Sequence, residues 1–426
     1  MNLAQINKKK IFLVLGFILL VFIFGYLIYY LFFKPATPPE VPPEEKEITQ
    51  LPKGVEGRPS GIIEEEEAEP IAPEEEIEEE EVVTRIPTEE EEVERRIDTV
   101  AQGGVTRTST LDYETTSSIV KSAENNDLFG YNPEKGEFYK VTPGGRKEVL
   151  SERIYKNVEN ITWSPDNNET ILEFPDGTNV LYNFQNNKQI TLPKEWTDFD
   201  FAPSGKQIAF KEMNDREDQR FISIANKDGS GQKYLENISY SENQFEVDWS
   251  PNKSVVAKFK EGATANTAEL YFVGQHGENF KSIRVNGYGL QTQWTPKGDK
   301  LLYSAHNLNS DHKPLLHIVD ASGNDIGKNH HSLKLNTWAE KCTIDNNNVA
   351  FCAVPKELPT GAGLAPEIAD TVPDYIYKVD LNTGTKSFVA EPMYEYTIDQ
   401  LTLSKDGKYL YFTDKAAKQV HSIQLK

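Results

Sequence analysis

A short sequence pattern recurs six times in the C-terminal part of the chain and restricts the fold more than any other feature. Each copy has an aromatic or apolar residue, a small residue, usually a proline, a polar turn and an apolar stretch. The copies are WSPDNNETILEF from Trp163, FAPSGKQIAF from Phe201, WSPNKSVVAKF from Trp249, WTPKGDKLLY from Trp294, CTIDNNNVAF from Cys342 and LSKDGKYLYF from Leu403. Their first positions lie 38, 48, 45, 48 and 61 residues apart. Periods in this range are typical of β-propeller blades.

Each copy predicts a β-hairpin. One strand ends at the first residue, the proline and the Asp, Asn, Gly or Lys residues form the turn, and the apolar stretch is the next strand. A second hairpin with a tight, often glycine-containing turn lies between the copies, at 179–193, 220–235, 269–285, 315–327 and 375–390. Two hairpins per repeat give four strands, which is the unit of a propeller.

The number of blades depends on the ends of the repeat region. A further hairpin at 128–143 indicates the outer half of a degenerate first blade, with 105–123 as its inner hairpin. This predicts an all-β propeller of seven blades over 105–426, and the alternative is six blades. The last blade takes only three strands from the C-terminus. We therefore expect a strand from about 98–108 to complete it and close the ring.

These WSPDG-like hairpins resemble the WD-repeat-like repeats of TolB-type periplasmic proteins and of prolyl oligopeptidase-type N-terminal propellers. The resemblance covers about 300 residues of the chain. It implies a propeller in which the motif Trp and Pro are structural, and the TolB-type resemblance implies a role in envelope assembly. The Gly-His and Trp-Asp dipeptides of cytosolic WD repeats are absent, and Cys342 stands where other copies have Trp.

Residues 11–33 carry no charge and are almost entirely apolar. As a helix they would be roughly 35 Å long, enough to cross a bilayer core. A cleaved signal peptide is the alternative, but its apolar core is shorter and is followed by small residues, whereas this segment ends in Tyr and Phe. We therefore predict a signal-anchor helix. Because Lys8, Lys9 and Lys10 precede it, residues 1–10 should be cytoplasmic and the C-terminal bulk extracytoplasmic.

Residues 34–104 contain 23 acidic and 7 basic residues, so they hold −16 of the net charge of −22. Dense like charge with little hydrophobicity cannot bury enough apolar surface to fold. We predict a disordered Glu- and Pro-rich stalk, with cation or basic-partner binding as the alternative role. The remaining chain is not basic either, which argues against nucleic acid as a partner.

The sequence carries no motif that favours catalysis. A prolyl oligopeptidase-type enzyme would need a hydrolase domain with a G-x-S-x-G elbow, and neither this pattern nor H-E-x-x-H occurs. Five histidines between His306 and His331 suggest a metal site, but no cysteine or carboxylate spacing accompanies them. We interpret them as loop and outer-strand residues and expect no metal and no cofactor.

The two cysteines, Cys342 and Cys352, lie on facing strands of one predicted hairpin. In an oxidising compartment they would form a disulfide across that hairpin. The alternative is a pair of buried free thiols.

Loop length gives the clearest indication of binding. The predicted connections between second and third strands are long at 212–219, 261–268, 305–314 and 355–374, and all emerge on the face that surrounds the channel mouth. Long loops on a rigid scaffold are where binding sites usually lie, although insertion drift is an equally good explanation. The candidate binding residues are Asp215, Arg216, Asp311, His312, Glu357 and Glu367.

Together these features predict a membrane-anchored propeller of the cell envelope that binds a protein, peptide or glycan and is not an enzyme. The alternative is a lyase or hydrolase that acts at the channel mouth with a pair such as Asp311 and His312.

Overall fold

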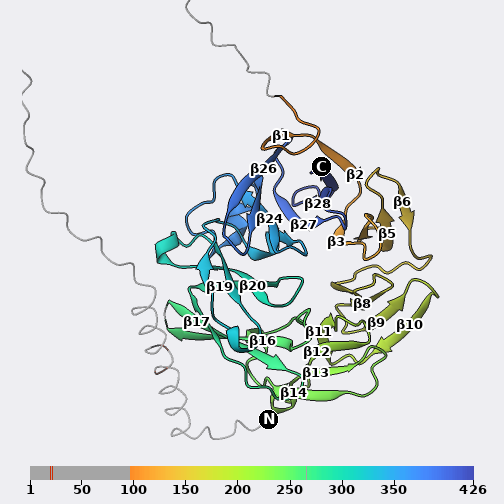
Figure 1. Ribbon diagram of the computed structural model, residues 1–426. Coiled ribbons are helices and arrows are strands. Elements are labelled where there is room, and N and C mark those ends of the chain that lie inside the picture. Colours follow the sequence, from red (N-terminus) through yellow and green to blue (C-terminus); the bar gives the residue numbers. More distant parts are fainter. Residues whose placement is uncertain (1–19, 21, 23–95, 265) are drawn as a thin grey trace, which may run out of the picture. The chain divides into compact units, whose positions relative to one another are not determined.

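The computed structural model describes residues 20, 22, 96–264 and 266–426. Seven blades surround a common axis (Figure 1), each built on an antiparallel four-stranded sheet, and in one of them a short parallel strand adds a fifth. This arrangement confirms the predicted all-β propeller with seven blades. The predicted membrane segment 11–33, apart from Leu20 and Phe22, and the predicted stalk as far as residue 95 lie outside the described residues. Among the described residues, no helix has the length and apolar character needed to cross a bilayer.

The strands of each blade follow one another from the channel outward, except in the last blade. Blade 1 is β3 (Ser117–Lys121), β4 (Leu128–Asn132), β5 (Glu137–Val141) and β6 (Lys147–Val149). Blade 2 is β7 (Asn160–Trp163), β8 (Glu169–Glu173), β9 (Asn179–Asn183) and β10 (Lys188–Leu192). Blade 3 is β11 (Trp196–Phe201), β12 (Gln207–Glu212), β13 (Phe221–Asn226) and β14 (Lys233–Asn237). Blade 4 is β15 (Phe245–Val247), β16 (Val255–Thr264), β17 (Thr267–Gly274) and β18 (Ile283–Asn286).

Blade 5 is β19 (Tyr288–Trp294), β20 (Lys300–His306), β21 (Leu315–Asp320) and β22 (His331–Ser332). Blade 6 is β23 (Cys342–Ile344), β24 (Val349–Pro355), β25 (Asp374–Asp380) and β26 (Lys386–Pro392). Blade 7 is β27 (Ile398–Leu403), β28 (Tyr409–Asp414), β29 (Val420–Gln424) and, from the other end of the repeat region, β2 (Thr108–Asp112).

The ring closes because β2 pairs antiparallel with β29, with Thr110 opposite His421. The sequence predicted such a strand at about 98–108, several residues too early. The residues just before β2 pair elsewhere: β1 (Gly104–Thr106) lies parallel to the outer strand β26 of blade 6. The amide of Ala101 donates to the carbonyl of Gln424 at 2.8 Å. Residues 98–103, assigned to the stalk from composition, are thus hydrogen-bonded to the propeller.

The first blade differs from its prediction. The hairpin at 128–143 supplies β4 and β5, the second and third strands, and not the outer pair. The stretch 105–123 contains no inner hairpin, because β2 leaves it to join blade 7 and only β3 stays in blade 1. A turn signal identifies a hairpin but does not say which two strands of a blade it joins, and that is why the assignment failed.

The inner hairpins explain the residue types of the repeated motif. Where the small residue carries a hydroxyl, this group accepts a hydrogen bond from the main-chain amide at the start of the next strand. Ser164 accepts from Glu169 (3.0 Å) and Ser404 accepts from Tyr409 (3.0 Å). Each of these turns also holds one residue with positive φ, which favours Gly and Asn. Those residues are Asn167, Gly205, Lys253, Gly298, Asn348 and Gly407.

In blade 6 the motif position was misassigned by two residues. Trp163 pairs with Thr170 at the end of its inner strand, and the residue at the same place in blade 6 is Ile344, which pairs with Ala350. Successive side chains of a strand point to opposite faces, so a shift of two residues keeps the same side chains on the buried face. The alternation of apolar and polar residues is therefore unchanged and could not reveal the error.

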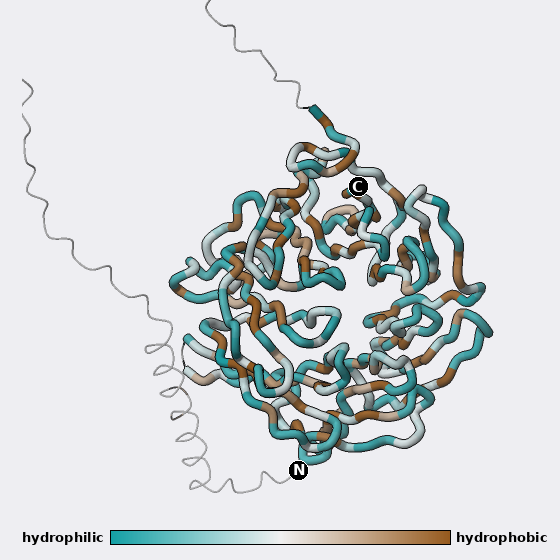
Figure 2. The backbone as a smooth tube through the Cα atoms, in the orientation of Figure 1, coloured by the Kyte–Doolittle hydropathy of each residue, from teal (hydrophilic) through white to brown (hydrophobic). Residues whose placement is uncertain are grey.

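The core lies between the blades. Apolar residues follow the strands, and hydrophilic residues dominate many of the loops (Figure 2). One buried cluster joins Ala209 and Ile224 of blade 3 to Phe245 and Val256 of blade 4. Each blade therefore buries its apolar faces only against its two neighbours.

Every boundary between neighbouring blades, here called a seam, is also crossed by a hydrogen bond between a side chain and the main chain. The innermost strand of a blade is a sheet edge with unpaired main-chain groups, and these bonds occupy some of them. In order around the ring, the donors and acceptors are Trp163 Nε1 to Ser118 O (3.0 Å), Asp198 N to Glu173 Oε1 (3.0 Å), Trp249 N to Asp200 Oδ2 (2.6 Å), Lys260 Nζ to Leu290 O (3.0 Å), Ala339 N to Ser304 Oγ (3.1 Å), Ile398 N to Asp374 Oδ2 (2.7 Å) and Ile119 N to Gln400 Oε1 (3.0 Å).

Loss of packing at the closing strand should weaken the whole ring. Leu111 of β2 is buried in a cluster that contains Tyr139 of blade 1 and Tyr411 of blade 7. We expect Leu111→Ala to lower the free energy of unfolding by about 2–4 kcal/mol, measured by urea denaturation of the full chain with tryptophan fluorescence. Val149→Ala, on the half-exposed outer strand β6, is the control and should cost less than about 0.5 kcal/mol. Equal losses would contradict a central role for β2.

Candidate functional site

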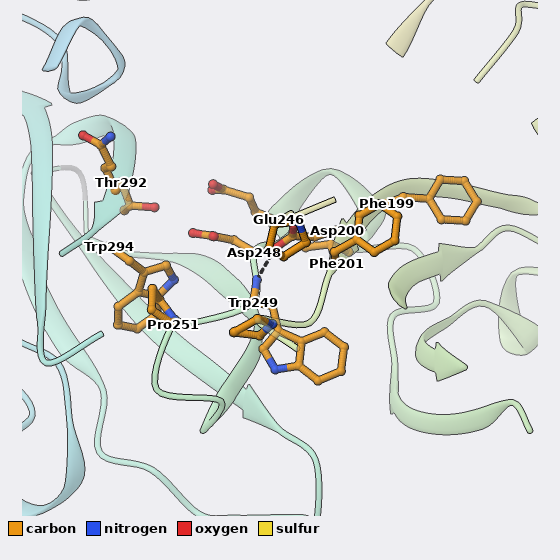
Figure 3. A pocket seen from close by; sticks show the side chains of 13 residues that line it. Phe199, Asp200, Phe201, Glu246, Asp248, Trp249, Pro251, Thr292 and Trp294 are labelled. Atoms are coloured by element: carbon orange, nitrogen blue, oxygen red, sulfur yellow. Dashed lines mark hydrogen bonds between the residues drawn. The ribbon is translucent and has the colours of Figure 1, made fainter. Parts of the chain in front are cut away.

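A concavity of about 610 Å³ lies on the channel side of blades 3, 4 and 5. It is lined by β11, β15 and β19 and by the turns that follow β7, β11 and β15. Figure 3 shows its polar side, where the carboxylates of Asp200, Glu246 and Asp248 lie close together near Trp249. A cavity with several carboxylates is a natural place to look for acid–base chemistry.

The charges in this cavity hold blades together. The side chain of Lys258 is fully buried and donates to Asp248, to Glu246 (3.1 Å) and to the hydroxyl of Thr292 in blade 5. Lys260 donates to Glu246 (2.5 Å) and bonds the carbonyl of Leu290, also in blade 5. Burying a lysine is tolerable only when such partners surround it. Glu246 and Asp248 are therefore the counter-ions of buried or half-buried lysines.

Asp200 has the most unusual chemistry in the cavity. Burial, together with the nearby charge of Asp248, raises its pKa to about 7. Such a pKa suits a general acid or base, but the same carboxyl accepts the seam bond from Trp249. Sequence reasoning missed this residue. It could have been noticed because its carboxylate stands between two aromatic residues, in the segment FDF at 199–201 of a predicted inner strand.

The raised pKa of Asp200 makes stability depend on pH. Between the ordinary aspartate pKa and about 7, the folded protein keeps a proton that the unfolded chain has lost, so stability falls as pH rises through this window. Asp200→Asn keeps an oxygen for Trp249 and removes the titration. We expect the variant to gain on the order of 2 kcal/mol relative to wild type between pH 4 and pH 8, measured by denaturant unfolding.

The exposed control Asp215→Asn should show no such pH-dependent gain. A difference between Asp200→Asn and wild type that stays constant across this pH range would contradict the raised pKa.

The predicted binding residues lie in loops on the face formed by the connections between second and third strands and between blades, here called the loop face. Asp215 and Arg216 occupy the loop after β12, where Arg216 pairs with Asp218 at 2.6 Å. Asp311 and His312 lie after β20 with left-handed backbone (φ 53° and 52°). Glu357 and Glu367 lie, exposed, in the loop after β24.

One predicted loop is not a loop. Residues 261–268 were expected to connect two strands, but β16 runs to Thr264 and β17 starts at Thr267, with Lys260 opposite Leu270 and Gly262 opposite Ala268. The polar, alanine-rich sequence hid the strands, because a hairpin that extends beyond the sheet buries little and therefore shows no apolar alternation.

Three loops of blades 5 and 6 are joined into one element, here called the loop plate: residues 307–314, 356–373 and 393–397. The amide of Gly361 donates to Asp311 O (2.9 Å) and that of Gly363 to His312 O (2.7 Å). On the other side, the hydroxyl of Thr397 donates to Val372 O (2.9 Å). The structure thus brings together four of the six predicted residues, Asp311, His312, Glu357 and Glu367, and leaves Asp215 and Arg216 over blade 3.

The loop plate has its own core. Leu358, Ala362 and Ala369 are buried against Trp338, which belongs to the connection between blades 5 and 6. Three residues after Trp338, Lys341 pairs with Asp374 at 2.7 Å, and both side chains are buried. The 18-residue loop between β24 and β25 is therefore a packed structure, and sequence reasoning, which saw only its length, missed this.

His306 fixes the position of the plate. A side chain at Gly363 would collide with its imidazole, and one at Gly289 would lie 2.7 Å from it, so the ring is held between two glycines. Burial and the neighbouring His312 lower the pKa of His306. Two further histidines contact Tyr303: His317 stacks on its ring and His330 hydrogen-bonds its hydroxyl. Within the described residues, no three His, Cys, Asp or Glu side chains are arranged to hold a metal ion.

The two cysteines form a disulfide. Cys342 and Cys352 are directly opposite each other on β23 and β24, with their Cα atoms 4.0 Å apart, and both are buried. The bond ties the innermost strand of blade 6 to the strand that leads into the loop plate.

Crowding around His306 gives a test of the plate. We expect Gly363→Ala to raise the rate of proteolytic cleavage within residues 356–373 at least tenfold over wild type. The Cβ of the new alanine has no room beside the imidazole of His306, so the loop must shift. The measurement is limited proteolysis with mass spectrometry. Gly262→Ala is the matched control, since an added Cβ meets nothing within 4 Å there. Equal cleavage of both variants and wild type would show that the loop is not held by this contact.

No protein-family model matches the sequence, and no curated protein matches it. Solved structures with a similar fold include the β-propeller domain of Myceliophteria thermophila Cps50 (Swd1), with 11% identity, a TM-score of 0.49 and coverage of 75% of this chain and 100% of that one. Kuenenia stuttgartiensis hydrazine synthase has 12% identity, a TM-score of 0.48 and coverage of 76% and 98%. Oligogalacturonate lyase from Vibrio parahaemolyticus has 8% identity, a TM-score of 0.48 and coverage of 75% and 93%. Identities this low bear on the fold alone.

Proposed function

We propose that this protein is a membrane-anchored propeller that binds a partner on its loop face outside the cytoplasm and has no catalytic role. One observation carries the proposal. Among the described residues, all large apolar side chains that are exposed in loops between strands lie on the loop face, and none lies in the loops of the opposite face. They are Tyr113, Ile154, Tyr240, Leu308, Leu364, Ile368 and Tyr394.

This asymmetry supports binding because a soluble surface has no reason to collect exposed apolar side chains on one side only. Exposed apolar residues scattered singly are normal, whereas several gathered in one place mark an interaction site. Four of the seven lie in the joined loops of the loop plate: Leu308, Leu364, Ile368 and Tyr394. The long loops 213–220 and 356–373 lie on the same face. A rigid ring that presents variable loops on one face is the arrangement that binding proteins use repeatedly.

The placement outside the cytoplasm is supported by the chain's N-terminus and by its disulfide. The uncharged segment 11–33 follows three lysines, which favours an uncleaved anchor with the propeller on the far side of the membrane. Disulfides persist in oxidising compartments, and Cys342 and Cys352 are bonded. The resemblance to TolB-type repeats agrees with a role in the cell envelope.

Catalysis is the less well supported function. The pair Asp311 and His312, considered from sequence, serves through its main-chain carbonyls to hold the loop plate. Asp200 has a suitable pKa but is engaged at a seam, and the carboxylates beside it are paired with lysines. The geometry therefore favours binding.

The proposal is tested by cross-linking in cells. A membrane-impermeant, amine-reactive cross-linker is added to intact cells or spheroplasts that express the tagged full chain, and the products are identified by mass spectrometry. We expect a specific product that Leu364→Ser with Ile368→Ser reduces at least fivefold. The control, Ile190→Ser with Tyr234→Ser on exposed outer strands, should leave it unchanged.

Products that form only after lysis would refute the extracytoplasmic placement. If the yield of the cross-linked product is the same in wild type and in the Leu364→Ser, Ile368→Ser variant, the proposal that the loop face binds the partner is wrong.

A further inference from the structure

The exposed surface of the loop plate is apolar at several points. Leu308 is 68% exposed, Leu364 is 61% exposed, Ile368 is 43% exposed and Tyr394 is 60% exposed. These residues come from all three loops of the plate, which hydrogen bonds hold in fixed relative positions. More than half of the exposed apolar loop side chains of the loop face are thus concentrated over blades 5 and 6.

Unpaired negative charge accompanies these apolar side chains. The plate contains five carboxylates, and among the described residues only that of Asp370 has an ion pair, with Lys415 at 2.5 Å. Of its two lysines, Lys356 is paired with Glu391 at 2.7 Å, which leaves Lys313. The four carboxylates in no ion pair are Asp311, Glu357, Glu367 and Glu395. Four unpaired acids against one unpaired base give the plate surface a net charge of −3.

We propose that the loop plate docks a basic amphipathic segment of another polypeptide. This proposal rests on the proposed function, since it names the partner chemistry of the same face. The apolar side of such a segment covers Leu364, Ile368 and their apolar neighbours, while its Lys or Arg residues meet the unpaired carboxylates. Charge complementarity of this kind selects partners and speeds their encounter.

Other occupants fit less well. The acidic residues 34–95 of this same chain carry a net charge of −16, which the carboxylates of the plate would repel. Neutral glycans would leave the four carboxylates without counter-charges. Because the plate is packed on its own core of Leu358, Ala362 and Ala369, it is preformed, and a partner loses little affinity to ordering it.

The experiment measures peptide binding to the full chain in zwitterionic nanodiscs, with empty nanodiscs as the blank. The probes are two fluorescent 18-residue amphipathic peptides with the same leucine pattern, one with lysine and one with glutamate at the polar positions, followed by anisotropy. We expect the lysine peptide to bind and the glutamate peptide to bind at least tenfold more weakly. Raising the salt concentration should weaken the lysine peptide, because the charges involved are exposed.

Two variants and a matched control locate the site. We expect the triple variant Asp311→Asn, Glu357→Gln, Glu367→Gln, and separately Leu364→Ser with Ile368→Ser, each to raise the Kd of the lysine peptide by about tenfold. The control Glu152→Gln with Glu159→Gln changes exposed carboxylates of the same face between blades 1 and 2 and should alter Kd less than twofold. Circular dichroism checks that each variant is folded.

The outcomes separate the two proposals. Equal binding of both peptides, or an equal loss in the control variant, overturns the basic-partner proposal. If neither peptide binds the plate while cross-linking in cells still depends on Leu364 and Ile368, the binding face stands and its partner chemistry is not basic. If Leu364→Ser with Ile368→Ser instead abolishes self-association in sedimentation, the occupant is a second copy and this proposal is wrong.

Discussion

The whole structure depends on one strand pairing, that of β2 with β29, which closes the ring. It brings together residues that are 311 positions apart in the chain, as in the hydrogen bond between Thr110 and His421. A propeller blade has two apolar faces and covers each of them only with a neighbouring blade, so an open ring would leave two faces in water. The closing strand therefore decides the stability of every blade.

Closing the ring creates a second constraint at the channel. Seven innermost strands present sheet edges there. At each seam a side chain of one blade bonds the main chain of its neighbour, and this side chain comes from the preceding blade at every seam except that of blades 1 and 2. Three of these side chains are carboxylates, those of Glu173, Asp200 and Asp374. Burial raises the pKa of each. Perturbed carboxylates in a cavity usually suggest catalysis, but here the same perturbation follows from joining one blade to the next.

The sequence was sufficient for the architecture because the turn motif is local: a Ser or Thr hydroxyl, a residue with positive φ and an apolar strand are all within ten residues. It was insufficient where the outcome depends on distant segments. Nothing local distinguishes β2, which joins blade 7, from β3, which starts blade 1. Loop length led to the predicted binding residues Asp311, His312, Glu357 and Glu367, but it gave no reason to single out Leu364, Ile368 and Glu395, which belong to the same loop plate. Their grouping depends on hydrogen bonds between loops of different blades, and such bonds leave no pattern in the sequence.

The loop plate shows how a rigid surface is built on this ring. Strand β24 runs directly into the loop 356–373, and the disulfide between Cys342 and Cys352 ties that strand to its inner neighbour. Above this base, the imidazole of His306 is enclosed by Gly289 and Gly363, and the buried pair of Lys341 and Asp374 links the plate to the seam with blade 7. A loop of 18 residues would lose much conformational entropy on binding if it were free. Held at these three points, it presents its apolar and acidic side chains in one arrangement, as the proposed docking of a basic partner requires.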